Sequence, residues 1–115
     1  MKNIQRIKKN SHFQRLYKKG KSFVSPCFVL YLRENQTGNL RLGITVSKKI
    51  GKAVLRNRAK RVLRAAVREM SLKGLCGYDV ILVARGKTPF VKSTVISKEL
   101  TTILINGGYL KEEKE

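Results

Sequence analysis

The stretch that decides the fold runs from Leu40 to Met70 and reads LRLGITVSKKIGKAVLRNRAKRVLRAAVREM. In its first part, Leu40–Ser47, apolar and polar side chains alternate, which predicts a strand with one buried face. From Ala53 to Met70, apolar residues recur instead at the spacing of a helix with one buried stripe. That stripe comprises Ala59, Val62, Leu63, Ala66, Val67 and Met70. A strand followed by such a helix predicts a sheet with helices packed on it.

The residues before this stretch predict a helix and another strand. Ser11 and Gln14 have the spacing of a capping box, which predicts a short helix that ends near Lys19. The segment Cys27–Arg33 alternates in the same way as the strand at Leu40. Residues 35–39 read NQTGN, a sequence typical of turns, so we expect these two strands to pair as an antiparallel hairpin.

The residues after the stretch predict one more strand and one more helix. Asp79–Arg85 is apolar on both faces, as the central strand of a sheet would be. Thr94–Asn106 has one apolar side and is followed by two glycines, which predicts a final helix. The order helix, strand, strand, helix, strand, helix predicts a single-domain α+β fold over residues 1–115, an α/β sandwich with a mixed sheet. We expect residues 1–7 and 108–115 to fray.

The charge of the chain predicts a polyanionic partner. It has 26 Lys and Arg against 7 Asp and Glu, a net charge of +19. Residues 1–68 hold 19 of these cations and a single acid, Glu34, so the partner should meet this part of the chain. No apolar run approaches the roughly 20 residues of a membrane span, and we expect a cytoplasmic protein. Cys27 and Cys76 have no metal-ligand spacing, which favours two reduced thiols over a disulfide or a metal site.

The basic residues are concentrated in and just before the helix from Ala53 to Met70. The candidate RNA-binding residues are Lys49, Lys52, Arg56, Asn57, Arg58, Lys60, Arg61, Arg64 and Arg68. The alternative is a helix face that is simply solvated. Such faces mix acidic with basic residues, however, and no acidic residue lies between Glu34 and Glu69. Positive charge at a helix N-terminus also opposes the helix dipole by about 0.3–1 kcal/mol per residue. Phosphate would compensate this cost, so we predict that this face binds phosphates.

Catalytic residues are not predicted in the chain itself. His12 is its single histidine, and no metal-ligand cluster is apparent, so we predict neither a catalytic residue nor a metal site. We expect His12 to be exposed and without a role. Aromatic residues predict a second RNA surface instead: Phe13 and Tyr17 share one helix face, and Tyr31 points away from the predicted core. Exposed aromatic rings beside positive charge stack unpaired bases; a place in the core is the alternative for Phe13.

The run from Val46 to Arg61, VSKKIGKAVLRNRAKR, resembles the signature of the bacterial ribonuclease P protein subunit. The segments FQRLY at 13–17, FVLY at 28–31 and YDVILVAR at 78–85 also resemble that family. The resemblance implies a sandwich with a left-handed βαβ crossover, against the usual right-handed rule. It implies that the catalytic RNA holds Mg²⁺ and cleaves precursor tRNA, while the protein binds both RNAs. We predict no obligate protein partner. The protein would hold the single-stranded leader in a cleft between the first helix and the sheet.

By position, the resemblance assigns the basic helix to the catalytic RNA and a second set of residues to the 5′ leader. The leader-binding set is Phe13, Tyr17, Val29, Tyr31, Thr45 and Lys48. The role of Tyr109 stays open. A ribosomal-protein-like binder of structural RNA is the main alternative, since charge and size suit it equally. A protein nuclease acting alone lacks acidic metal ligands, and a helix-turn-helix DNA binder would need a second helix next to the basic one.

Overall fold

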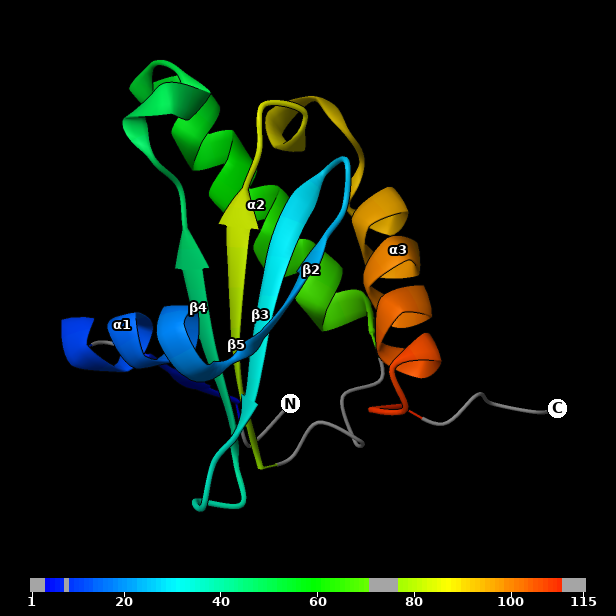
Figure 1. Cartoon of the computed structure of the whole chain (residues 1–115). Helices are drawn as coiled ribbons and strands as arrows, with labels where there is room; N and C mark the ends of the chain where they lie inside the picture. Colours follow the sequence, from blue (N-terminus) through cyan, green and yellow to red (C-terminus); the bar gives the residue numbers. More distant parts are fainter. Residues whose placement is uncertain (1–3, 8, 71–76, 111–115) are drawn as a thin grey trace, which may run out of the picture.

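The computed structural model describes residues 4–7, 9–70 and 77–110, which form a five-stranded sheet and three helices (Figure 1). The strands are β1 (Ile4–Arg6), β2 (Lys21–Val24), β3 (Phe28–Glu34), β4 (Leu40–Thr45) and β5 (Tyr78–Ala84). The helices are α1 (Asn10–Lys19), α2 (Ala53–Glu69) and α3 (Ser93–Asn106), with 3₁₀ turns at Lys48–Ile50 and Thr88–Phe90. All six predicted elements are present, and the prediction of an α+β domain is confirmed.

The strand order is β1-β4-β5-β3-β2, with β5 in the centre as its apolar sequence predicts. β5 runs parallel to β4 and antiparallel to β3. The predicted hairpin between β3 and β4 is therefore wrong, because β5 lies between them. Both ends of the turn after β3 are hydrogen-bonded to Gly77, the residue before β5. The Asn35 N–H donates to Gly77 O, and the Gly77 N–H donates to Asn39 O. Only a central position buries both faces of β5.

Helices cover both faces of the sheet. α2 and α3 pack on one face, over the inward side chains of β3, β4 and β5, and form the larger core. Its fully buried side chains include Phe28, Leu30, Leu63, Leu82 and Ile96. α1 packs on the opposite face, where Ile7, Leu16 and Ile81 form a smaller cluster. Figure 1 shows β4 and β5 pointing upward, with β5 to the right of β4 and α2 behind the sheet. The crossover is thus left-handed, as the resemblance implied.

Four details of the prediction need correction. Strands β1 and β2 were not predicted, because three and four residues carry too little alternation. The N-terminal segment is not frayed at β1, which pairs with β4, or at Ile7, which is buried. The capping box is also wrong, because α1 already begins at Asn10 and its N-cap is Lys9. Tyr109 is not frayed either; residues 111–115 lie outside the described residues.

The open role of Tyr109 is structural in part. Its ring lies edge-on to those of Phe23 and Tyr78, with centroid distances of 6.2 and 5.6 Å. Tyr109 and Leu110 both pack against the larger core. Because Phe23 belongs to β2 and Tyr78 to β5, this short segment after α3 ties the edge strand to the central one.

Candidate nucleic-acid interface

The basic residues of α2 lie on its solvent side. The predicted buried stripe is confirmed: Ala59, Leu63 and Ala66 are fully buried, and only Val62 is half-buried. The exposed members of the predicted phosphate-binding set are Lys49, Lys52, Asn57, Arg58, Arg61, Arg64 and Arg68, while Arg56 and Lys60 are half-buried. Lys49 lies outside the helix, in the 3₁₀ turn before it. We call the set of nine residues the basic face.

The N-terminus of α2 is unusually positive. Its N-cap is Lys52, which makes no capping hydrogen bond through its side chain, and the first turn holds no acid. Within residues 4–7, 9–70 and 77–110 the only ion pair joins Arg41 and Asp79, so no cation of the basic face is neutralised there. Gly51 has a φ of +136°, which favours glycine and explains its place between the turn and α2. Lys49 and Lys52 thus lie at the same end of α2 as the free N–H groups of its first turn, an arrangement that favours an anion.

The predicted leader-binding residues gather on the other face of the sheet, at the contact with α1. The Tyr17 ring lies 4.9 Å from that of Tyr31, at an edge-on angle of 76°, and 6.5 Å from that of Phe13. The Tyr17 and Thr45 hydroxyls are hydrogen-bonded at 3.2 Å. Val29 and Thr45 lie in one cross-strand row through Val83. We call Phe13, Tyr17, Val29, Tyr31 and Thr45 the aromatic cluster; its members are half-buried. Lys48 is exposed, three residues after Thr45.

Gly43 explains how Phe13 reaches the sheet. It shares a row with Ile81 and Tyr31, on the face that α1 covers. A Cβ atom at Gly43 would lie only 2.7 Å from Phe13 Cε1 and 2.9 Å from Cζ. The Phe13 ring therefore rests directly on the backbone of β4. Glycine within a strand often marks such a close approach.

A polar network beside the aromatic cluster was not predicted. Arg41 donates a hydrogen bond to His12 Nδ1, and its Nε lies 3.4 Å from Asp79 Oδ1. Asn35 Nδ2 also donates to Asp79, at 2.8 Å. The expectation of an exposed histidine is wrong, because His12 is half-buried and accepts from Arg41. His12 and Asp79 lie far apart in the sequence, so only the fold could bring them to one arginine.

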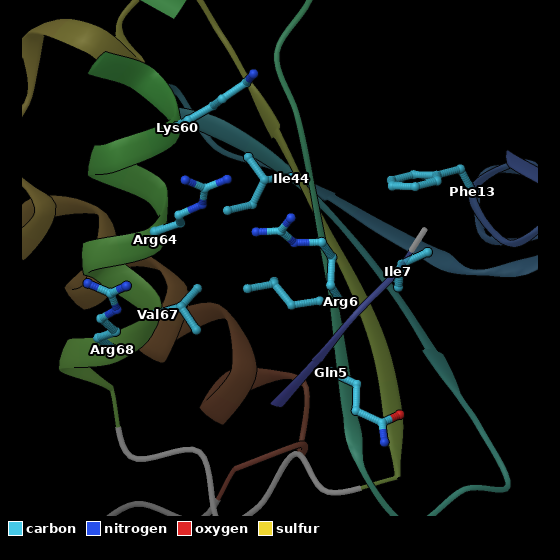
Figure 2. Close-up of a pocket in the computed structure, with 10 residues that line it drawn as sticks. Gln5, Arg6, Ile7, Phe13, Ile44, Lys60, Arg64, Val67 and Arg68 are labelled. Carbon is cyan, nitrogen blue, oxygen red and sulfur yellow. The ribbon is translucent and has the colours of Figure 1, made fainter. Parts of the chain in front are cut away.

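A pocket of about 490 Å³ lies between β1, β4 and α2 (Figure 2). Its lining residues are Gln5, Arg6, Ile7, Phe13, Leu42, Ile44, Lys60, Arg64, Val67 and Arg68. Figure 2 shows the Arg6 side chain reaching from β1 toward α2, from which Arg64 reaches out. Arg6 is not among the predicted RNA-binding residues, because residues 1–7 are expected from the sequence to fray.

Three further observations describe the chemistry of the molecule. In the described ranges, no three His, Cys, Asp or Glu side chains come together as a metal site would need. Burial, and then the nearby Glu99 carboxylate, raise the pKa of the Cys27 thiol above its ordinary value. Cys76 lies outside the described residues. None of the described helices is both long and apolar enough to cross a membrane.

Comparison with known proteins identifies relatives along nearly the whole chain. The family model for ribonuclease P matches residues 1–106. The ribonuclease P protein component of Oceanobacillus iheyensis is 40% identical over 115 residues, which cover 99% of this chain and 95% of that protein. The solved ribonuclease P protein of Thermotoga maritima is 31% identical, with a TM-score of 0.74 over 89% of this chain and 96% of that one. A Staphylococcus aureus ribonuclease P protein mutant, described as having defective mRNA degradation activity, is 39% identical, with a TM-score of 0.76 over 90% and 87%.

Proposed function

This chain belongs to the ribonuclease P protein component family, and from that premise we propose how it divides its surface between two RNAs. Family membership makes it a subunit of the ribonuclease P holoenzyme, a ribonucleoprotein of tRNA processing. We propose that the basic face binds the catalytic RNA. We propose further that the aromatic cluster, with Lys48, binds the 5′ leader of precursor tRNA. The holoenzyme would act in the cytoplasm.

The observation that carries this proposal is the separation of two chemically different surfaces. The basic face lies mainly on α2, which packs on one face of the sheet, and the aromatic cluster lies under α1 on the other; the two meet at the pocket beside β1, which Phe13 lines together with Lys60 and Arg64. Phosphate contacts hold an RNA in place whatever its sequence, which suits attachment to a large folded RNA. Aromatic rings stack bases that are unpaired, which suits a single-stranded leader. One protein can therefore contact both RNAs at once.

The residues of each surface would act by binding and orienting. On α2, the exposed Arg58, Arg61 and Arg64 guanidinium groups present forked donors that match phosphate oxygens. On the other face, the edge-on contact with Tyr17 and the packing of the smaller cluster hold Tyr31 in place for a base. Cleavage itself is proposed to depend on Mg²⁺ held by the catalytic RNA. The chain's seven acidic residues and one histidine supply few ligands for such an ion.

The test compares Arg58→Ala with Tyr31→Leu. Leucine keeps apolar bulk in the smaller cluster but removes the stacking ring. We expect Arg58→Ala to weaken assembly with the catalytic RNA whatever the leader length. We expect Tyr31→Leu to weaken binding of leader-bearing precursor tRNA by about 1–3 kcal/mol, the range for one lost stack, and to leave leaderless tRNA unaffected. Lys98→Ala, which removes an exposed cation from α3, is the matched control.

Two results would contradict the proposal. If Tyr31→Leu weakens the binding of both substrates equally in a folded protein, the aromatic cluster is not a leader site. That result would favour the alternative of a protein that binds structural RNA. Protein freed of all RNA should not cleave precursor tRNA at any Mg²⁺ concentration. The same preparation should also be assayed for cleavage of mRNA, because one solved relative is a mutant with defective mRNA degradation activity. Cleavage that survives RNA removal would place catalysis in the chain.

A further inference from the structure

The pocket between β1 and α2 lies where the edge of the sheet changes. β1 pairs with β4 only along Leu40–Leu42, and the Ile7 N–H donates to Leu42 O at 2.9 Å. β4 continues to Thr45, so in the described chain its last residues have no strand on that side. The side chains of Leu42 and Ile44 are only half-buried there. The end of β1 thus leaves a hollow with an apolar floor beside the basic face.

The walls of this hollow carry like charges. Arg6 comes from β1, and Lys60, Arg64 and Arg68 come from α2. No lining residue is acidic, and the only ion pair among the described residues, Arg41–Asp79, lies elsewhere. Opposed guanidinium groups repel one another unless an anion lies between them, because like charges near one another are unfavourable. The two cationic walls therefore form a site for a negatively charged group.

The floor indicates that this group carries an apolar part. The half-buried Leu42 and Ile44 supply aliphatic surface beneath the cations, and the buried Ile7 and Val67 add only narrow strips to it. A backbone phosphate alone needs no such surface, whereas an unpaired base does. Arginine planes also stack on bases. The volume of about 490 Å³ lies within the range of pockets that hold small ligands.

We infer that this pocket receives one unpaired nucleotide of the catalytic RNA. Its phosphate lies between Arg6 and Arg64, and its base rests on Leu42 and Ile44. The inference rests on the proposed function, because it extends the basic face from α2 across to β1. It adds Arg6 to the RNA-binding residues and converts a one-sided phosphate surface into a two-walled site.

The experiment measures binding of the full-length protein to its catalytic RNA, together with chemical probing of base reactivity by dimethyl sulfate. Arg6→Ala should weaken binding by about tenfold or more, because charge-assisted contacts are lost. The salt dependence should flatten by about 0.7–0.9 in log–log slope. One unpaired nucleotide that the unchanged protein protects should become reactive. Lys21→Ala, an exposed cation on the opposite edge strand, should change none of these.

A second variant tests the floor without removing charge. Ile44→Gln keeps the size of the side chain but makes the floor polar, so we expect the same nucleotide to lose protection while the salt slope is unchanged. Thermal unfolding of each variant shows that it is folded. If Ile44→Gln is not, Arg6→Ala alone decides, because Arg6 is exposed.

The outcomes separate this inference from the proposed function. If Arg6→Ala binds like Lys21→Ala while Arg64→Ala is weakened, the pocket is empty in the complex, and the basic face still stands. If neither arginine matters, both fail. If Arg6→Ala binds the catalytic RNA more weakly but base protection is unchanged, Arg6 contacts a phosphate only. That result would overturn the inference that a nucleotide base occupies the pocket. If Arg6→Ala instead lowers the affinity for leader-bearing precursor tRNA alone and leaves binding of the catalytic RNA unchanged, the pocket belongs to the substrate, and the inference is wrong.

Discussion

Replacing Gly43 by alanine should disturb the aromatic cluster through a single methyl group. The new Cβ would lie 2.7 Å from Phe13 Cε1, whereas carbon atoms in contact prefer about 3.5–4.0 Å. The ring must therefore retreat by about 0.8 Å or more. The φ of Gly43 is not positive, so alanine fits the backbone, and the ring contact is the main conflict. Overpacking of this kind costs about 1–3 kcal/mol.

The assay is a double-mutant cycle read by urea unfolding. In the unchanged protein, Gly43→Ala should lower the free energy of unfolding by about 1–3 kcal/mol. In a Phe13→Ala background it should be neutral, or stabilising by up to about 1 kcal/mol, because glycine is unfavourable inside a strand. Gly43→Ala alone should also weaken the binding of leader-bearing precursor tRNA, by about 5- to 150-fold if one stacking contact is lost. Equal destabilisation in both backgrounds would refute the contact between Gly43 and Phe13.

Three other predictions follow from the described residues. Arg61→Ala should flatten the log–log salt dependence of RNA binding by about 0.7–0.9 with unfolding unchanged, and an unaltered slope would remove Arg61 from the basic face. Leu63→Ala, at a fully buried position, should cost about 2–5 kcal/mol in urea unfolding, and a smaller loss would mean that the core refills the space. With Cys76→Ser, the remaining Cys27 should resist iodoacetamide at pH 7 until urea unfolds the chain, because burial raises its pKa and keeps the thiol protonated. Rapid labelling of the folded protein would contradict its burial.

The elements that the sequence predicts well have long patterns of their own. α2 repeats its apolar stripe over about three turns, and the central place of β5 follows from apolar residues on both of its faces. The outward direction of Tyr31 follows from alternation alone and is the same whichever strand lies beside β3. Such features depend on local periodicity, which is readable without a partner.

The features that the sequence does not predict are contacts between distant segments. The pairing of β3 with β5 instead of β4 is decided by burial across the whole sheet. The turn residues 35–39 are compatible with a β3–β4 hairpin as well as with the observed arrangement, so they do not decide between the two. Gly43 looks like any small outward residue until Phe13 is placed over it. Arg6 looks like part of a charged tail, because a three-residue strand has no pattern by which to recognise it.

The central position of β5 has a consequence for synthesis on the ribosome. Six of the eight helices and strands in the described chain precede β5, yet β3 and β4 meet only through it. While the nascent chain is shorter than Ala84, both strands present unpaired inner edges, and the apolar side of α2 lacks part of its sheet. Folding must wait for a late segment and then close long loops, which is a slow route. A chain truncated before Tyr78 would carry the whole basic face on an unfolded polypeptide, prone to aggregation and degradation.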